Sequence, residues 1–409
     1  MGRLLVARAP HPAPSARERL RAVPSARAFL PLAVAALGVA ALVAASRLGD
    51  YVVDAGPAVN ALAAGSFRRA AAVPFLMGPL SVVLRAPFVW AAHRSGAGQL
   101  GSYRAGILPC LAAAGALGIV LARRSRSWGW LVVVLAVASP AALAAVQEGH
   151  PEEALGGALC VAAVLLALDR HTVWAALALG LAVATKEWAL LAVAPTLLAA
   201  RPGGRMKLAA GAAVTAAAVY LPFFVRDPHA FMTAIRGEAH VESSATPETV
   251  WLLAAHSEKF HVDGFPTLTY HAVAHWVPPV SHALIVLAAI PIGLLLWRRG
   301  ASGADALALL ALLFLLRCVL DPVDQDYFHL PFVLALLAFE TWSRRDRLPL
   351  GTVAAAACLW LTFDLQAHHV APGAIDSFYL AWTAATAAYL LLGMRLIRRR
   401  GRGTDLSLS

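Results

Sequence analysis

The sequence predicts an all-α protein, a polytopic bundle of about 11 or 12 helices that cross a membrane. Of its 409 residues, 60% are hydrophobic and only 14% are charged, which is too little polar surface for a soluble domain of this size. Several stretches of about 18 or more residues are nearly free of charge, enough to cross a hydrocarbon core about 30 Å thick. The spans must be helices because lipid offers no water to unpaired backbone groups.

The arginines fall in short clusters between the apolar stretches, and these clusters indicate the topology. A net charge of +11 would suggest a nucleic-acid partner in a soluble protein. No folded basic domain is present, so we expect no nucleic-acid binding. Clusters between spans are typical of cytoplasmic loops and of contacts with anionic membrane lipids. We therefore expect a multi-pass protein of the plasma membrane with both termini in the cytoplasm.

The elements follow from the N-terminus in order. Residues 1–27, rich in Pro, Arg and Ala, are expected to form a disordered cytoplasmic arm without a convincing cleavage site. A transmembrane domain is expected over 28–396 and a cytoplasmic tail over 397–409. The expected spans lie near 28–46, 104–122, 128–147, 153–169, 173–186, 188–200, 207–225, 279–297, 303–319, 329–342, 348–363 and 378–395. The short pair over 173–200 could be a hairpin that turns inside the bilayer, broken at Thr185–Lys186–Glu187.

The remaining segments face outward, and they hold most of the acids and nearly all of the histidines. The two longest are the exterior loops 47–103 and 226–278, and shorter turns lie at 147–152, 321–328 and 364–377. The topology rests on the arginine clusters alone, yet it places most of the acids on one face. The exterior face is therefore expected to carry the chemistry.

The first exterior loop opens with Asp50 and Asp54, directly after the first span. A carboxylate at a membrane surface can act as a general base on a hydroxyl acceptor. Asp54 also precedes Pro57, so it could instead cap a helix N-terminus. A helical pattern follows and ends at Gly65, and the Pro-punctuated piece over 74–88 resembles a helix lying at the membrane interface.

The turn "QEGHPEEALGG" over 147–157 is polar between two apolar stretches. Pro151 suits the first position of a helix, and Glu152 and Glu153 would then favour the helix dipole in its first turn. That structural explanation leaves Glu148 and His150 unexplained. These two side chains require a wet or polar cavity.

Lys186 lies far from either end of the apolar run "LALGLAVATKEWALLAVAPTLL". A charge at that depth costs at least about 2.5–3.5 kcal/mol on insertion scales, so Lys186 is a functional candidate. Glu187 could be its counter-ion only if the helix breaks, because neighbours in sequence point about 100° apart on a helix. Lys186 could then reach an anionic group such as a phosphate. The alternative is an internal salt bridge to another span.

The turn "LRCVLDPVDQDYFHLPF" offers further polar groups near the outer face. Arg317 could bind a phosphate with its fork of donors. The acids could bind a divalent metal, but their spacing matches no defined metal motif, and a solvated turn is the alternative. The four cysteines show no CxxC or Cys/His spacing, and the histidines of loop 226–278 show no HxH or HExxH, so no zinc site is indicated.

Several stretches together resemble the polytopic membrane glycosyltransferases of the GT-C class, and glycosyltransferase family 87 in particular, the mannosyltransferase-like group of actinobacteria. The stretches are "DYVVDAGPAVNALAAG", "PFLMGPLSVVLRAPF", "GHPEEALGGALCVAAVLLAL", "GLAVATKEWALLAVAPTLL" and "LDPVDQDYFHLPFVLALLAFE". They cover most of the chain from Asp50 to Glu340.

This resemblance implies an inverting transfer of a hexose, expected to be mannose, from a polyprenyl-phosphate donor to a lipid or glycan acceptor of the cell envelope. The general base would be Asp54 or Asp50, with Asp54 favoured because it leads directly into the helix that ends at Gly65. Lys186 would lie near the carrier phosphate. The other residues assigned to substrate or carrier binding are Arg317, His150, Glu152, Glu153, Asp321, Tyr327 and His329.

The implied reaction uses no cofactor, and the sequence contains neither GxGxxG nor a P-loop. A divalent metal is possible but not indicated. Three alternatives remain open. A secondary transporter would also have about twelve spans and broken helices, but such proteins usually show internal repeats, and none is found. A non-catalytic membrane protein is the second, and an exterior acyltransferase or lipid-linked ligase is the third.

Overall fold

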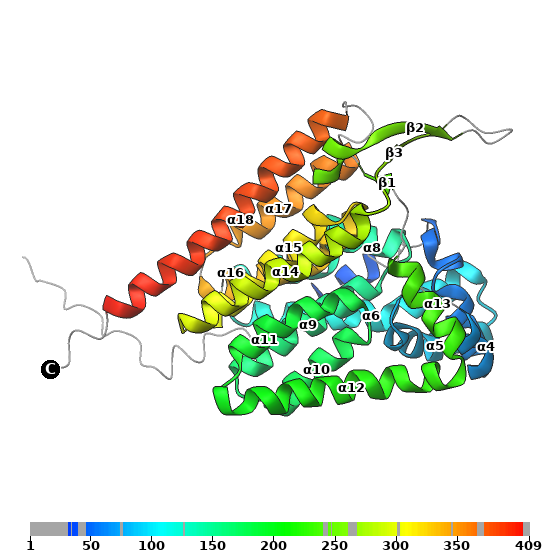
Figure 1. Ribbon diagram of the computed structural model, residues 1–409. Helices are drawn as coiled ribbons and strands as arrows, with labels where there is room; N and C mark the ends of the chain where they lie inside the picture. The colour runs from blue at the N-terminus through cyan, green and yellow to red at the C-terminus, as the bar shows by residue number, and fades with distance from the viewer. Residues whose placement is uncertain are drawn as a thin grey trace, which may run out of the picture.

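The computed structural model confirms the predicted helical bundle (Figure 1). It describes residues 32–33, 35–39, 46–73, 77–125, 127–239, 244–246, 248–260, 268–300, 303–344, 347–365 and 372–403. The expected cytoplasmic arm and most of the first expected span lie outside these residues. Within the described part, every other expected span coincides with helix.

Six helical segments are long and apolar enough to cross a membrane, which makes this a multi-pass membrane protein. They are Gln99–Ala122 (α6), Gly129–Gln147 (α7, Gly129–Ala138, and α8, Pro140–Gln147), Pro202–Arg226 (including α12, Arg205–Arg226), Val277–Arg298 (α14), Gly303–Leu320 (α15) and Gly373–Met394 (within α18, Pro372–Gly403). Shorter apolar helices cover Thr172–Val183 (α10), Glu187–Ala199 (η3, Glu187–Ala192, and α11, Val193–Ala199) and Leu350–Asp364 (α17, Leu350–Trp360, continuing into η7, Leu361–Leu365). The pair expected over 173–200 is therefore two short helices.

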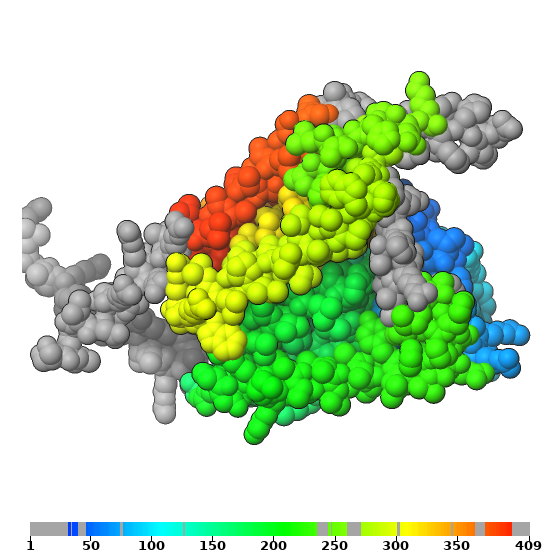
Figure 2. Space-filling view, viewed as in Figure 1, coloured from blue at the N-terminus to red at the C-terminus, as the bar shows by residue number. Residues whose placement is uncertain are grey.

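The centre of the bundle is formed by α15, α16 (Leu330–Ser343) and α9 (Glu152–Leu168), which pack against one another. Nearly every side chain of α16 is buried, because a helix that is apolar all round can be covered on every side. By contrast, α12 and α14 lie on the surface (Figure 2) and expose large apolar side chains such as Val214 and Leu287. Such faces suit contact with lipid.

Glu340 is a buried carboxylate that joins three C-terminal helices. Its Oε1 accepts hydrogen bonds from the Gly351 amide at 2.9 Å and the Tyr389 hydroxyl at 2.7 Å. Its Oε2 accepts from the amide and the hydroxyl of Thr352, both at 2.8 Å. A buried charge is tolerated when its lone pairs are used in this way. Glu340 therefore connects α16 with α17 and α18.

The exterior loop expected over 47–103 folds mainly into helices. After η2 (Gly49–Val52) come α3 (Gly56–Ala63), α4 (Phe67–Ala72), α5 (Pro79–Arg94) and the start of α6. Gly65, at φ +78°, follows the end of α3 as the sequence predicted. The capping role considered for Asp54 is wrong, since the N-cap of α3 is Ala55 and no side chain caps it.

Loop 226–278 contains a helix and a small sheet at one end of the bundle (Figure 1). The helix is α13 (Pro228–Ala239), and β1 (Ser244–Ala245), β2 (His256–Phe260) and β3 (Leu268–Ala272) form an antiparallel sheet in the order β1-β3-β2. Ser244 and His256 both lie opposite Ala272. The remaining described elements are η4 (Pro202–Gly204), η5 (Val250–Ala254) and η6 (Asp326–His329).

Candidate active site

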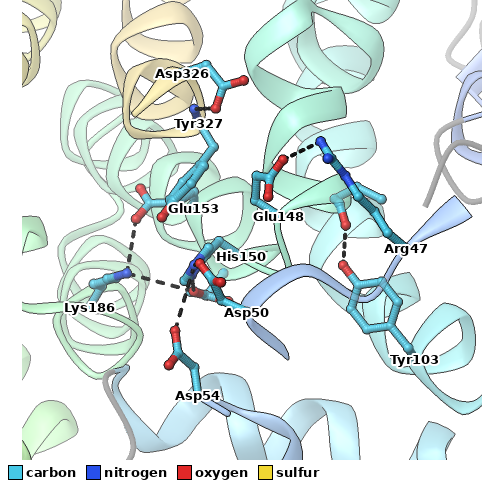
Figure 3. A network of polar contacts seen from close by, with 12 residues as sticks. Arg47, Asp50, Asp54, Tyr103, Glu148, His150, Glu153, Lys186, Asp326 and Tyr327 are labelled. Atoms are coloured by element: carbon cyan, nitrogen blue, oxygen red, sulfur yellow. Dashed lines mark hydrogen bonds and ion pairs between the residues drawn. The ribbon is translucent and has the colours of Figure 1, made fainter. Parts of the chain in front are cut away.

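One cluster of charged side chains gathers residues from segments far apart in the sequence (Figure 3). Asp50 and Asp54 come from η2 and the residues before α3. His150 comes from the turn between α8 and α9. Lys186 comes from the break between α10 and η3. Glu152 and Glu153 lie in the first turn of α9, Arg317 lies in α15 and Tyr327 lies in η6.

Two glycines allow the Asp50 segment to touch the His150 turn. The Asp50 amide donates to the Glu148 carbonyl at 2.8 Å. Gly49 and Gly149 have φ values of +53° and +95°, which side-chain-bearing residues rarely adopt. A Cβ on Gly149 would lie 2.5 Å from the Tyr51 amide nitrogen. This close approach of two backbone turns sets the carboxylates beside the imidazole.

The His150 imidazole bridges acids on both sides. Its Nδ1 lies 2.9 Å from Glu152 Oε1, and its Nε2 lies 3.3 Å from Asp50 Oδ2 and 3.8 Å from Asp54 Oδ2. Burial alone would lower the pKa of His150, but hydrogen bonds to Asp50 and Glu152 outweigh it and raise the pKa to about 9. At neutral pH, His150 is therefore an imidazolium. Its ring also stacks on Tyr327, with centroids 4.4 Å apart.

The two aspartates differ in a way that separates their chemistry. The hydrogen bond from His150 lowers the pKa of Asp50, whose side chain is 58% exposed. Burial raises the pKa of Asp54, whose side chain is 15% exposed. A carboxylate with a raised pKa is the stronger base. Asp54 is therefore better suited than Asp50 to accept a proton.

Lys186 lies where the helix breaks, as the sequence predicted. Its Nζ is 3.4 Å from Glu153 Oε1 and 3.8 Å from Glu152 Oε1. The side chain of Glu187, the counter-ion considered from the sequence, is exposed, whereas the close contacts of the ammonium are with the two glutamates of α9. The alternative of an ion pair with another helix is the observed arrangement, because the extended backbone at Lys186 directs the ammonium toward α9.

The break is held by the segment before α5. The Gly78 amide donates to the Thr185 carbonyl at 2.9 Å, and the Leu80 amide donates to the Ala184 carbonyl at 3.0 Å. A Cβ on Gly78 would lie 2.2 Å from the Ala184 oxygen. The carbonyls freed at the end of α10 therefore find partners from outside the helix.

Arg317 reaches the same cluster from α15. Its Nη1 lies 3.8 Å from Glu153 Oε2 and donates to the Phe328 carbonyl at 3.2 Å. The guanidinium packs over the rings of Phe328 and Trp188, at 4.6 and 5.3 Å from their centroids. Trp188 in turn donates to Glu153 Oε1 at 3.1 Å. Lys186 and Arg317 thus flank the same glutamate.

Arg85 is a member of the cluster that sequence reasoning missed. Its side chain is fully buried in α5, its Nη1 lies 3.8 Å from Glu152 Oε2, and its guanidinium stands 4.8 Å from the Tyr51 ring centroid. None of its three nitrogens has an ordinary hydrogen bond to a described residue. The signal was available, because Arg85 interrupts the apolar stretch "PLSVVLRAPF" as Lys186 interrupts its own.

Three polar residues of the exterior turns lie outside the cluster. Glu148 forms an ion pair with Arg47. Asp321 Oδ2 lies 3.8 Å from His282 Nε2. His329 belongs to a second buried group, in which its Nε2 lies 2.9 Å from the Tyr379 hydroxyl.

A divalent cation could bind where Asp50, Asp54 and His150 meet, because one ligand atom from each lies within 4.8 Å of the others. The imidazolium proton of His150 already occupies the space between these acids. A cation would therefore have to displace that proton. These three residues could therefore bind a metal ion only if His150 first lost its proton.

Comparison with solved structures gives a likeness in fold. No protein-family model matches the chain, and no curated protein matches it. The chain is similar to the crystal structure of ArnT from Cupriavidus metallidurans bound to undecaprenyl phosphate, with 17% sequence identity and a TM-score of 0.49. The alignment covers 92% of this chain and 73% of that chain.

Proposed function

We propose that this protein is a membrane glycosyltransferase that transfers a hexose from a polyprenyl-phosphate donor to a lipid or glycan acceptor on the exterior face. One observation carries the proposal. A carboxylate suited to act as a base, Asp54, shares a cluster with the buried cation of Lys186. Glycosyl transfer from a lipid phosphate requires both groups, a base for the acceptor hydroxyl and positive charge for the leaving phosphate.

The acceptor side of the reaction belongs to Asp54. Its carboxylate would take the proton of the acceptor hydroxyl while the oxygen attacks the anomeric carbon and inverts it. His150 lies between Asp54 and Asp50, and its Nε2–H donates a hydrogen bond to the Asp50 carboxylate. That hydrogen bond leaves Asp50 the weaker base, so Asp50 would orient the imidazolium.

The donor side belongs to Lys186, with Arg317 behind it. As the bond between the anomeric carbon and the phosphate oxygen breaks, one negative charge passes from Asp54 to the carrier phosphate. The total charge of the site is unchanged, but its centre moves toward the two cations. Fixed cations placed where charge develops stabilise a transition state without reorganisation. Mannose is the expected sugar from the resemblance to family 87.

The neighbouring rings and acids hold these groups in place. Tyr327 stacks on the His150 ring, and Glu152 contacts His150, Lys186 and Arg85 at 2.9, 3.8 and 3.8 Å. Glu152 would therefore fix the position of His150, beside Asp54, relative to Lys186, which would bind the carrier phosphate. Asp321 and His329 lie outside the cluster, and we assign them no part in binding the carrier phosphate.

The test is sugar transfer from radiolabelled polyprenyl-phosphate-mannose in membranes that express the wild type, Asp54→Asn or Asp50→Asn. We expect Asp54→Asn to lose about 10²–10⁴-fold of the rate, the usual contribution of a general base. Asp50→Asn should lose far less, and it serves as the matched control. Equal rates in wild type and Asp54→Asn would overturn the assignment of the base.

A wild type that transfers from neither polyprenyl-phosphate-mannose nor polyprenyl-phosphate-glucose would contradict the proposed reaction. The alternative of a secondary transporter then makes a distinct prediction. Proteoliposomes containing the protein would accumulate a labelled solute, with no new glycosidic bond in the lipid extract.

A further inference from the structure

We propose that Cys318, Asp324 and His329 form a transition-metal site, with a donor set that favours Zn²⁺. The three side chains come from the end of α15, the following turn and η6, and all three are buried. One ligand atom from each lies within 4.8 Å of the others. This group is separate from the cluster of Asp54 and Lys186, and the inference does not depend on the proposed glycosyl transfer.

His329 is oriented as a metal ligand is. Its Nδ1 lies 3.2 Å from the Gln325 carbonyl, which assigns the ring proton to Nδ1 and leaves a lone pair on Nε2. Histidines that bind metals commonly donate their other nitrogen to a backbone carbonyl in this way. Nε2 lies 3.4 Å from Asp324 Oδ2. Two ligands at about 2.1 Å from a tetrahedral zinc ion stand about 3.4 Å apart.

Asp324 supplies the negative charge that such a site needs. Its side chain is 1% exposed, and neither carboxylate oxygen has an ordinary hydrogen bond to a described residue, although the Tyr379 hydroxyl is near. The nearest ring nitrogen, His329 Nε2, turns its lone pair toward that carboxylate. The Tyr379 hydroxyl has one proton, which it can donate to Nε2 or to Asp324 but not to both. The buried carboxylate and the lone pair therefore still need a second proton or a cation between them.

Cys318 completes the set with sulfur. Its Sγ lies 3.4 Å from the Phe328 carbonyl, so the thiol is held beside η6. Sulfur, imidazole and carboxylate together are typical of zinc, which binds all three in tetrahedral sites. The Tyr379 hydroxyl, 2.9 Å from His329 Nε2, stands near the position for a fourth ligand. The spacing Cys-x5-Asp-x4-His matches no zinc motif because a helix end and a turn bring the ligands together.

The site would hold the turn that carries Tyr327. Tyr327 lies between Asp324 and His329 in sequence, and its ring stacks on His150. A metal bound by the two flanking residues would fix this turn and, through the stacked rings, one wall of the His150 cluster. The role is structural, so metal content and stability are the appropriate measurements.

The experiment uses the full-length protein in detergent, with Cys110, Cys160 and Cys358 replaced by serine so that Cys318 is its one thiol. The protein is treated with a chelator, loaded with Co²⁺ and desalted. We expect one cobalt ion per chain and a near-ultraviolet band for charge transfer from thiolate to cobalt. In this protein such a band can arise only from Cys318.

Asp324→Asn and His329→Gln should remove the band and the bound cobalt, whereas Asp321→Asn, a matched control in the same turn, should keep both. Zn²⁺ should raise the Tm of the chelated protein and not that of His329→Gln. The proposal is overturned if the single-thiol protein retains no cobalt or shows no thiolate band. It is equally overturned if the band persists without His329, since a protonated Asp324 would then explain the buried group.

Discussion

Replacing Lys186 with methionine separates two roles that the structure allows for this side chain. At an effective dielectric constant of about 20, unit charges at the observed separations attract by about 4.9 kcal/mol toward Glu153 and about 4.4 kcal/mol toward Glu152. Much of that attraction offsets the cost of burying the ions. The variant leaves the glutamates without their ammonium partner, and removing one member of a buried pair typically costs about 3–5 kcal/mol. We expect a loss of stability in that range.

The double variant Lys186→Met/Glu153→Gln removes both charges at once. Its glutamine oxygen can still accept the hydrogen bond of Trp188, and Glu152 retains Arg85 and His150. Arg317 loses its carboxylate partner but keeps its hydrogen bond to the Phe328 carbonyl. We expect at least half of the lost stability to return. Thermal unfolding in detergent measures the recovery, and Lys207→Met, an exposed lysine at the start of α12, should stay within about 0.5 kcal/mol of wild type.

Sugar transfer by the same variants distinguishes the two roles. If Lys186 binds the carrier phosphate, the double variant should regain stability and still lose about 10²–10³-fold in rate, as when a charge-stabilising donor is removed. Recovery of transfer together with stability would refute the carrier role and leave Lys186 as an ion-pair partner. Full stability in Lys186→Met would refute the electrostatic reasoning itself.

Three further predictions concern the surroundings of the site. The pKa of His150 is raised from 6.5 to about 9 in the folded protein, so its contribution to stability is complete below pH 6.5 or so and is lost as the pH rises through about 9. The Tm of wild type should therefore fall across this range more steeply than that of His150→Gln, and parallel curves would contradict this. Gly78→Ala should lose about 1–3 kcal/mol of stability or more because its Cβ would clash with the Ala184 carbonyl. Gly98→Ala is the control, since its Cβ would meet nothing within 4 Å. Equal Tm values for the two variants would contradict the close backbone contact between Gly78 and Ala184. Glu340→Gln should lose about 1–3 kcal/mol, since an amide nitrogen would face donors that a carboxylate accepts, and an unchanged Tm would show that this junction is not needed.

Apolar runs and isolated charges predicted the bundle and much of the cluster. The run lengths located the spans, and the short pair over 173–200 suggested a break at Lys186. Asp50 and Asp54 were candidates because they open the first exterior loop, and His150 because the helix start at Pro151 does not explain it. The structure brings these four side chains together, although their roles remain proposals.

The remaining features depend on information that a local pattern does not contain. Arg85 does interrupt an apolar stretch, but that stretch was expected to be an interfacial helix, and only tertiary packing shows that α5 is covered by α3 and α6. Glu187 was the partner considered for Lys186 because it is adjacent in sequence, whereas Glu153 and Glu152 are 33 and 34 positions away. The sheet was not foreseen, since β1 has two residues and its partners have five each.

The position of the site residues along the chain has a consequence for how the protein folds during synthesis. Asp50, Asp54, His150, Glu152, Glu153 and Lys186 all precede the midpoint of the chain, and the Gly78 segment that holds the Lys186 break precedes that break. Because a nascent chain emerges N-terminus first and can fold as it emerges, this ionic set can assemble before α15 and η6 leave the ribosome. Arg317 and Tyr327 then arrive as its last components. A chain truncated after α12 would therefore leave Glu153 without Arg317 and the His150 ring without the Tyr327 ring that stacks on it.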